Sequence, residues 1–402
     1  MDPRANPFSP GAGTQPPELA GRDEIVQNAT IALERVGTGR HARSQMLLGL
    51  RGVGKTVLLN RIEQLAAERG FLTIVLEAPE DKQLAELLVP PLRSRLVALS
   101  RVEQAKDIAK RALGVLRAFA SAFKVKVGDI EFGVERASGT ADSGSLEHDL
   151  PELLAAVATA AKSAGTGVAI LVDEVQYLSA GDLGAVIVSL HRGDQKGLPL
   201  TFFGAGLPQI AALAGDAKSY AERLFEYPEV GKLSDEAARS AIRAPVQREG
   251  VEITEEALKI IVEETEGYPY FLQEWGSQAW NAATTSPITA ADARRATTEA
   301  LNRLDQGFFR VRLDRLTPRE RDYVRAMAEL GRGPHRSGEI ANLLGIQVTT
   351  AGPLRNGLIK KGMIYSQQHG ETAFTVPMFD EFMRRSMPQW RLTKKGRRGR
   401  GK

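Results

Sequence analysis

The sequence predicts an α/β protein whose parallel sheet is followed by a helical segment and then by a small C-terminal module of helices and a hairpin. The sheet is predicted because short apolar runs alternate with helical patterns, near residues 46–49, 71–76, 168–173 and 200–204. A shorter fifth strand is expected near residues 227–231. From Ser234 the pattern becomes helical, with Ser234 and Thr254 as helix caps, and it remains so to about Leu304.

Composition excludes several classes of protein. The 402 residues are 43% hydrophobic, which is ordinary for a globular protein of two or three domains. No apolar stretch approaches the roughly 18 residues of a membrane-spanning helix, and the N-terminus lacks the pattern of a signal peptide. The absence of cysteine excludes disulfides, thiolate metal sites and cysteine nucleophiles, and the five histidines show no metal-ligand spacing. We therefore expect a cytoplasmic protein without membrane contact.

Residues 49–56 form the most specific motif, Gly-Leu-Arg-Gly-Val-Gly-Lys-Thr. This G-x-x-x-x-G-K-T pattern lies between an apolar run and a helical pattern, as in loops that bind nucleotide phosphates. Backbone N–H groups surround the phosphates, Lys55 supplies a positive charge, and Thr56 supplies a hydroxyl to Mg²⁺. The alternative is a glycine-rich turn with an exposed lysine. The residues expected to bind nucleotide are Gly49, Leu50, Arg51, Gly52, Val53, Gly54, Lys55, Thr56 and Val57.

A second motif follows at residues 168–174, where an apolar strand ends in two acids. In open α/β sheets, ligands bind beyond the carboxyl ends of the strands, where these acids would emerge. We expect Asp173 to hold Mg²⁺ through water and Glu174 to polarise the attacking water of ATP hydrolysis. Alone, such a run is often only the end of a strand, but together with the phosphate loop it predicts an Mg²⁺-dependent ATP hydrolase.

The C-terminal module has the order helix, helix, turn, helix and hairpin. Thr317 to Glu320 forms a capping box with Pro318 at the first helical position, and the helix runs to about Leu330. A short helix at 337–345 and a third at 348–361 follow, with Gly352-Pro353 either in the first turn of the third helix or breaking it. Two short strands around residues 367–370 complete a two-stranded wing. This order predicts a winged-helix domain.

Charge is distributed unevenly along the chain. The whole chain carries +4, of which the tail 391–402 carries +7 and residues 308–388 carry +5, so the remainder carries −8. A basic end attracts polyanions, and in DNA-binding winged helices the third helix enters the major groove. Thr349, Thr350 and Arg355 are the candidate DNA contacts, with His369 at the wing tip. The alternatives are a tail that only aids solubility and a winged helix that docks proteins.

The two nucleotide motifs, at residues 49–56 and 168–174, resemble those of an AAA+ ATPase of the origin-recognition and archaeal-ATPase branch, which ends in a winged helix. The resemblance spans about residues 17–388. Residues 19–24 resemble the motif that packs beside the adenine, which places Arg22 there. Residues 219–225 resemble the segment of the arginine finger, which makes Arg223 the candidate; its alternative is an ion pair with Glu222. A finger that acts on a neighbouring copy implies a homo-oligomer.

Two positions depart from the pattern of this family. The first sensor position has no clear occupant, because Thr201 comes early in its strand and Gln209 lies beyond the following turn. At the second sensor position, where the family has arginine, this chain has tyrosine in the segment Gly267-Tyr-Pro-Tyr270. A tyrosine supplies no permanent cation to a phosphate, so slow hydrolysis is expected. The aromatic residues of this segment are expected in the core of the lid rather than on the adenine.

The domain boundaries follow from these patterns: a disordered N-terminus (1–16), the nucleotide-binding core (17–232) with an insertion (78–166), the lid (233–306), the winged helix (307–388) and the basic tail (389–402). The insertion combines two helical patterns with a hairpin that turns at Gly128-Asp129. We expect an ATPase that couples nucleotide state to DNA binding. The alternatives are a signalling ATPase whose winged helix and insertion bind proteins, and a helper ATPase of transposition or replication.

Overall fold

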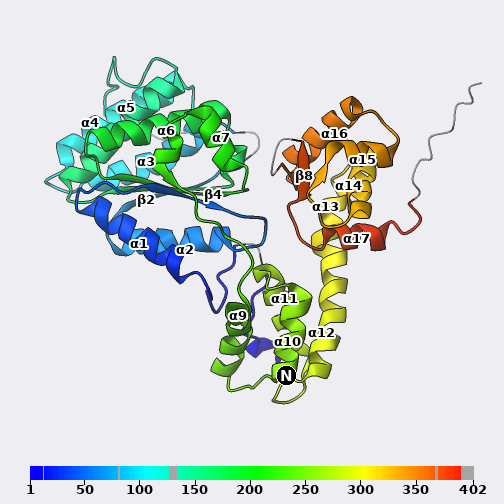
Figure 1. The fold of residues 1–402 in the computed structure, drawn as a ribbon. Coiled ribbons are helices and arrows are strands. Elements are labelled where there is room, and N and C mark those ends of the chain that lie inside the picture. The colour runs from blue at the N-terminus through cyan, green and yellow to red at the C-terminus, as the bar shows by residue number, and fades with distance from the viewer. Residues whose placement is uncertain (12, 80–81, 126–133, 367–369, 391–402) are drawn as a thin grey trace, which may run out of the picture.

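A five-stranded parallel sheet forms the centre of the N-terminal half of the molecule (Figure 1). The computed structural model describes residues 1–11, 13–79, 82–125, 134–366 and 370–390. The strand order is β2-β3-β4-β1-β5. The strands are β1 (Ser44–Leu48), β2 (Leu72–Glu77), β3 (Val168–Asp173), β4 (Leu200–Gly206) and β5 (Phe225–Glu226). The four longer strands lie where the apolar runs predicted them. The fifth lies just before its predicted place and is only two residues long.

Helices cover both faces of this sheet, as the near-continuous apolar sequence of its central strands requires. On one face lie α1 (Asp23–Gly37) and α2 (Lys55–Glu68). On the other lie α3 (Leu84–Leu99), α5 (Leu146–Ser163) and α6 (Ala180–Gln195), with α4 (Lys106–Ala122) packed on α3 and α5. Two short helices, α7 (Ile210–Ala217) and α8 (Ala221–Leu224), follow β4.

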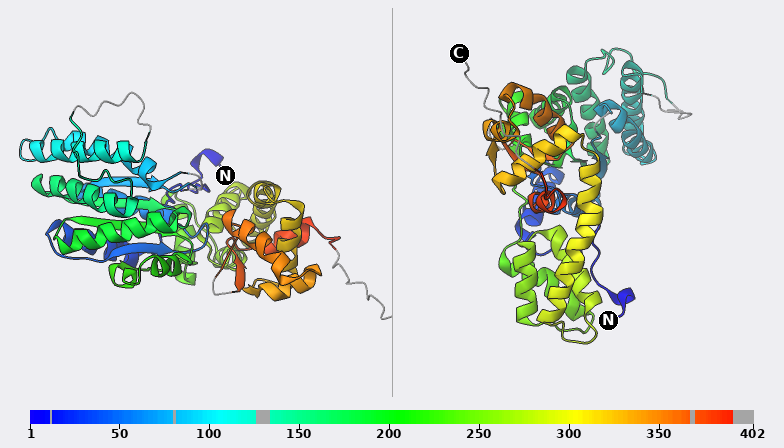
Figure 2. Two further views of the ribbon diagram at one scale, coloured as in Figure 1. Left: turned by 90° about the horizontal axis from the view of Figure 1, so that it is seen from above. Right: turned by 90° about the vertical axis from the view of Figure 1, so that its right-hand side faces the viewer.

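The lid is a bundle of helices that follows the sheet in the chain. It consists of α9 (Asp235–Arg248), α10 (Glu255–Thr265), α11 (Pro269–Ala282) and α12 (Ala290–Arg303). The side chains of Ser234 and Thr254 cap α9 and α10, as the sequence predicts. Figure 2 shows α12 running from the lid towards the C-terminal module, which it reaches through a π-helical turn (Leu304–Phe309) and α13 (Arg310–Asp314).

The C-terminal module is consistent with a winged helix. It contains α14 (Pro318–Leu330), α15 (Ser337–Leu344), α16 (Val348–Lys360) and α17 (Phe379–Ser386), with strands β6 (His335–Arg336), β7 (Ile364–Tyr365) and β8 (Glu371–Phe374). The sheet order β6-β8-β7 adds a strand to the predicted two-stranded wing. Pro353 neither breaks α16 nor lies in its first turn. Pro353 leaves one intrahelical hydrogen bond unmade, and Ala351 and Leu358 of the same helix are buried in the core.

The described residues of the N-terminal segment, for which disorder was predicted over residues 1–16, pack against the lid. Phe8 is buried beside Gly276 of α11. The side chain of Asn6 donates a hydrogen bond of 3.1 Å to the Ser277 carbonyl, and the Trp280 indole donates one of 2.9 Å to the Asp2 carbonyl. The disorder predicted from composition took no account of such tertiary contacts, which include the burial of Phe8 against the lid.

Three predicted features fall outside the described residues: the turn of the insertion hairpin, His369 at the wing tip and the basic tail from residue 391. Within the described ranges, the helices of the insertion match its two predicted helical patterns. Among all the residues that the structure describes, no helix is long and apolar enough to cross a membrane.

Candidate nucleotide-binding site

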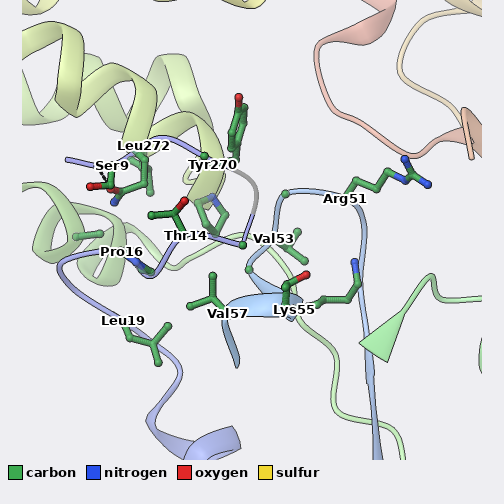
Figure 3. Close-up of a pocket in the computed structure, with 18 of the residues that line it drawn as sticks. Ser9, Thr14, Pro16, Leu19, Arg51, Val53, Lys55, Val57, Tyr270 and Leu272 are labelled. Carbon is green, nitrogen blue, oxygen red and sulfur yellow. Dashed lines mark hydrogen bonds between the residues drawn. The ribbon is translucent and has the colours of Figure 1, made fainter. Parts of the chain in front are cut away.

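A cavity of about 270 Å³ lies where the sheet, the lid and the N-terminal segment meet (Figure 3). The phosphate loop lines it from the sheet, and Tyr270 and Leu272 line it from the lid. Ser9, Gly13 and Thr14 of the N-terminal segment form another wall. Of the predicted nucleotide-binding residues, the cavity is lined by Arg22, Arg51, Gly52, Val53, Gly54, Lys55, Thr56 and Val57, and also by Glu174.

The phosphate loop has the backbone that its glycines permit. Gly52 and Gly54 have φ of 84° and 93°, values that residues with a Cβ rarely adopt. Directly after Gly54 the chain enters α2, so the N-terminus of this helix and its free N–H groups belong to the loop. Such a helix N-terminus attracts anions because of its unpaired donors and its dipole. The loop is therefore suited to phosphate.

Lys55 is buried at the start of α2, where its ammonium group donates a hydrogen bond of 2.8 Å to the Leu50 carbonyl. Burial lowers the pKa of Lys55 to about 8, although the nearby Glu174 and Asp173 carboxylates raise it. Because its ordinary value is 10.5, this lysine is held in an environment that disfavours its charge. A phosphate group beside it would favour the charged form.

Thr56 and Asp173 meet at the end of β3. The Thr56 hydroxyl donates a hydrogen bond of 2.6 Å to the Asp173 carboxylate. Burial raises the pKa of Asp173, while the Thr56 hydroxyl and the backbone N–H of Glu174 lower it. A hydroxyl and a partly buried carboxylate side by side are hard oxygen ligands, which fit Mg²⁺. The structure thus brings together the two residues that the sequence assigned to the metal.

Glu174 follows with a strained backbone. Its φ of 53° lies in the left-handed region, which is uncommon for a residue with a side chain. The Gln176 amide donates a hydrogen bond to the Glu174 carboxylate and accepts one of 3.1 Å from the Leu207 N–H, beyond the end of β4. Gln176 therefore joins Glu174 to the neighbouring strand.

Sequence reasoning missed Gln176. The signal available was a polar residue two positions after the acid pair, in a segment otherwise apolar or aromatic. The two positions considered for the first sensor lie elsewhere: Thr201 is fully buried near the start of β4, and Gln209 lies at the beginning of α7. Neither lines the cavity.

The two arginines carried over from the family pattern have different surroundings. Arg22 is buried, and its guanidinium donates hydrogen bonds to the carbonyls of Val53, at 3.2 Å, and Gly231. It therefore supports the phosphate loop as well as lining the cavity. Arg223 is exposed on α8 and does not line the cavity of its own chain. Among the described residues, no ion pair joins Arg223 to Glu222 or to another carboxylate.

The lid contacts the phosphate loop through two tyrosines. The Tyr268 hydroxyl donates a hydrogen bond to the Arg51 carbonyl, and the Tyr270 N–H donates one of 3.1 Å to the Gly52 carbonyl. Tyr268 is buried, as expected for the core of the lid, and burial raises its pKa. Tyr270 is only half-buried and lines the cavity.

The winged-helix module contacts the same loop. The Arg51 N–H donates a hydrogen bond of 3.1 Å to the Thr375 carbonyl, just beyond β8. The Arg51 guanidinium donates one of 2.7 Å to the Tyr177 hydroxyl and lies so close to Gly362 that a Cβ there would be 2.4 Å from it. Gly362, between α16 and β7, has a φ of 62°, a left-handed conformation that favours glycine.

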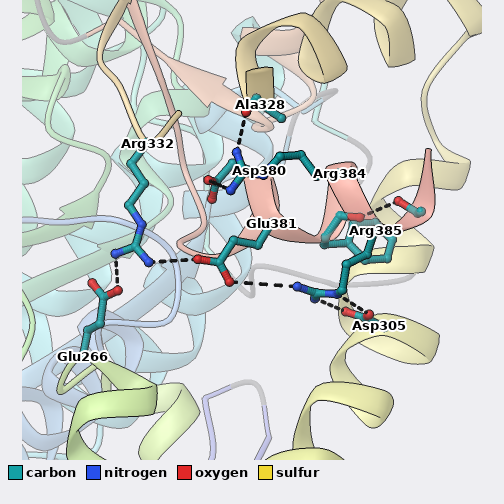
Figure 4. Close-up of polar contacts among 10 residues, drawn as sticks. Glu266, Asp305, Ala328, Arg332, Asp380, Glu381, Arg384 and Arg385 are labelled. Carbon is teal, nitrogen blue, oxygen red and sulfur yellow. Dashed lines mark hydrogen bonds and ion pairs between the residues drawn. The ribbon is translucent and has the colours of Figure 1, made fainter. Parts of the chain in front are cut away.

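Ion pairs tie the winged-helix module to the lid as well (Figure 4). Arg332, which follows α14, pairs with Glu266 of the lid and, at 2.9 Å, with Glu381 of α17. Arg385 of α17 pairs at 2.7 Å with Asp305 in the π-helical turn. These pairs are exposed, so each contributes at most about 1 kcal/mol, but they fix where the module sits.

The phosphate loop, the acid pair after β3 and the helical lid define a P-loop ATPase. Residues 18–203 match the family described as the AAA ATPase domain, and residues 306–383 match a family described as a domain of unknown function. Residues 18–203 therefore hold an AAA ATPase domain, as the sequence motifs predicted.

Individual proteins resemble this chain over most of its length. The chain is 24% identical over 355 residues to an uncharacterised HTH-type transcriptional regulator of Methanocaldococcus jannaschii, covering 85% of this chain and 83% of the regulator. It resembles the Walker-type ATPase of Pyrococcus abyssi with a TM-score of 0.60 and 19% identity, over 94% of this chain and 99% of that one. The Orc1 protein of Aeropyrum pernix in complex with DNA is more distant, with a TM-score of 0.48, 13% identity and coverage of 92% and 93%.

Proposed function

We propose that this ATPase binds ATP with Mg²⁺, hydrolyses it slowly, and uses its nucleotide state to control DNA binding by the winged-helix module. One observation carries the proposal: the phosphate loop is hydrogen-bonded directly to that module, from Arg51 to Thr375. A loop that adjusts to phosphate cannot move without straining this contact. The nucleotide site and the winged helix are therefore mechanically connected.

The chemistry of hydrolysis follows from the residues around the cavity. Backbone N–H groups of the loop and the Lys55 ammonium would bind the phosphates, and Thr56 and Asp173 would hold Mg²⁺. When bound, Mg²⁺ neutralises charge on the β- and γ-phosphates. Glu174 accepts a proton from the attacking water, and the oxygen of that water bonds to the γ-phosphorus. At the same time the bond between the γ-phosphorus and the β–γ bridging oxygen breaks, and ADP leaves. Gln176 holds the Glu174 carboxylate in place through its hydrogen bond.

Slow turnover follows from the position of Arg223. Its exposed side chain lies outside the cavity of its own chain, so as an arginine finger it would act at the site of a neighbouring copy. An arginine finger supplied in this way typically accelerates phosphoryl transfer by about 10³–10⁵-fold. A single copy therefore hydrolyses ATP slowly, and assembly into a homo-oligomer speeds it.

DNA binding is assigned to α16 and the wing. Thr349 and Thr350 are exposed at the start of α16, in the part of a recognition helix that reaches base edges. Arg355 donates a hydrogen bond of 2.8 Å to the Ser366 hydroxyl, which fixes it between helix and wing. The relative named as a helix-turn-helix transcriptional regulator supports this assignment. The basic residues 391–402 would add phosphate contacts that do not depend on base sequence.

Anisotropy of a fluorescent duplex of mixed sequence, titrated with the full chain, tests the DNA assignment. We expect binding at 50 mM salt that weakens steeply at 200 mM, as release of counterions requires. The double variant Thr349→Ala, Thr350→Ala should weaken binding, whereas Thr159→Ala, an exposed threonine of α5, should not. Absence of binding at low salt, with and without ATP, would contradict the assignment.

A second candidate function is protein docking. It is favoured by Val348, a residue that is 54% exposed at the start of α16, where an apolar group suits a protein surface better than a phosphate backbone. In that case the duplex would not bind at low salt, and Val348→Asp would weaken association with the partner without changing nucleotide affinity. The nucleotide switch would be the same, and only the partner would differ.

A further inference from the structure

Arg312 lines the nucleotide cavity from the segment that connects the lid to the winged-helix module. It belongs to α13, directly after the π-helical turn, and it faces the same cavity as Lys55, Thr56 and Glu174. No sequence motif includes it, because it lies far along the chain from the phosphate loop and outside the segment 267–270 that holds the second sensor position. The fold alone brings it to the site.

The guanidinium of Arg312 has no acidic partner among the described residues. It donates a hydrogen bond of 2.8 Å to the Phe308 carbonyl one turn earlier, and its Cζ lies 3.8 Å from the centre of the Phe308 ring. Its neighbour Arg310 behaves differently, because it is exposed and forms an ion pair of 3.3 Å with Asp314. Arg312 is thus a half-buried positive charge that protein carboxylates leave uncompensated.

The surroundings of Arg312 favour an anionic ligand. Burial and the nearby positive charge of Arg51 lower its pKa to about 10, so it stays protonated at neutral pH. Three arginines and Lys55 line this one cavity, against the two carboxylates of Glu18 and Glu174, so its charged lining is mainly positive. A planar guanidinium can donate two parallel hydrogen bonds to a phosphate, which a tyrosine at the second sensor position cannot do.

A short series of contacts links Arg312 to the phosphate loop. The Tyr270 ring stacks on Phe308, with ring centres 4.8 Å apart, and Phe308 in turn lies under the Arg312 guanidinium. The Tyr270 N–H is bonded to the Gly52 carbonyl of the loop. The same stack therefore holds the lid on the loop and positions Arg312 in the cavity.

We propose that Arg312 binds the terminal phosphate of ATP, and that this contact reports the presence of that phosphate to the winged-helix module. The inference rests on the proposed function in taking ATP as the ligand, and it names the residue that distinguishes ATP from ADP. Because α13 leads into α14, a displacement of Arg312 towards the phosphate would also displace the start of the winged-helix module. This cation is supplied by the chain itself, at a position other than the family's second sensor.

Nucleotide affinities of the full chain test the proposal. Displacement of a fluorescent ADP analogue by ATP or ADP, with Mg²⁺ present, gives both affinities for the natural protein, Arg312→Ala, Arg312→Lys and the control Arg310→Ala. A lost charge-assisted hydrogen bond predicts that Arg312→Ala weakens ATP about ten- to a hundredfold and leaves ADP unchanged. Arg312→Lys should keep part of the preference for ATP, and Arg310→Ala should change neither affinity.

Two outcomes would overturn the proposal: equal loss of ATP and ADP affinity in Arg312→Ala, or no loss of either. If Arg312→Ala fails to fold, the decision falls to Arg312→Lys, in which an undiminished preference for ATP over ADP contradicts the proposal. Hydrogen exchange supplies a second measurement, since ATP but not ADP should slow exchange in α13. Neither experiment involves DNA, so the role of Arg312 can be decided even if the winged-helix module does not bind DNA.

Discussion

The N–H of Arg51 donates a hydrogen bond of 3.1 Å to the carbonyl of Thr375, so one residue of the phosphate loop is bonded to the winged-helix module. The carbonyl of the same residue accepts a hydrogen bond from Tyr268 of the lid, and its guanidinium bonds Tyr177 beyond β3. Arg51 is therefore a junction at which three parts of the molecule meet beside the phosphate site. This arrangement relates phosphate binding to the position of the C-terminal module.

Tyr177→Phe tests this junction with the loss of one hydroxyl. The Arg51 guanidinium then loses a hydrogen-bond partner, and the free energy of unfolding should fall by about 1 kcal/mol. Hydrogen exchange should become faster around Thr375 and Gly362, because Arg51 is less firmly held there. Tyr220→Phe, outside the cavity, is the control. If exchange in the winged-helix module is unchanged in Tyr177→Phe, Arg51 does not connect the two parts.

Lys55→Ala and Glu174→Gln should separate binding from chemistry. Lys55→Ala removes the one lysine that lines the cavity among the described residues, and should abolish nucleotide binding. Glu174→Gln keeps the phosphate site and should bind ATP normally, but loses the group that accepts the proton and should turn over about 10²–10⁴-fold more slowly. Calorimetry measures the binding, and phosphate release measures the turnover. Equal loss of binding in both variants would contradict the role assigned to Glu174.

The pKa of Lys55 predicts how nucleotide affinity depends on pH. The pKa of Lys55 is about 8 in the free protein, so the amine loses its proton above that pH. Bound phosphates favour the protonated form, so nucleotide binding above pH 8 requires Lys55 to take up a proton. ADP affinity should be steady below that pH and then fall, by at most about tenfold per pH unit. The Lys55→Arg variant, which stays charged, should lack this fall whatever its affinity. A flat profile in the natural protein would exclude Lys55 as the titrating group.

Phe8→Ala tests whether the N-terminal segment closes the cavity. Truncating a buried phenylalanine typically costs about 3–5 kcal/mol, more than the few hydrogen bonds of this segment supply. The segment should detach, trypsin should cleave faster after Arg4, and nucleotide should dissociate faster. Phe8→Leu keeps most of the buried area and should stay close to the natural protein. Unchanged dissociation of nucleotide from Phe8→Ala would mean that the segment is not a wall of the binding site.

The sequence predicted the parts of the site that a local pattern determines. The loop from Gly49 to Thr56 and the acids after β3 are contiguous motifs, so their place at the sheet edge followed from the alternation of strands and helices. The match to the AAA ATPase domain family over residues 18–203 agrees with that prediction. The individual roles of Lys55, Asp173 and Glu174 stay predictions that the variants above address.

The remainder of the site depends on contacts between segments far apart in the chain. Phe8 lies on α11, Arg312 reaches the cavity from beyond the lid, and Thr375 bonds Arg51; none of these has a local signature. Gln176 is close to the acid pair, yet its role became visible only through its bond to the Leu207 N–H. Composition and periodicity report local structure, whereas these contacts depend on how the domains pack.

The most direct test compares DNA affinity across nucleotide states in one protein. Glu174→Gln, which should hold ATP without hydrolysing it, is titrated into a fluorescent duplex at 50 mM salt with Mg²⁺ and either ATP, ADP or no nucleotide. If the nucleotide controls the winged helix, the duplex affinity with ATP differs from that with ADP by tenfold or more, on the order of a typical coupling free energy. Equal affinity in all three states would contradict that control.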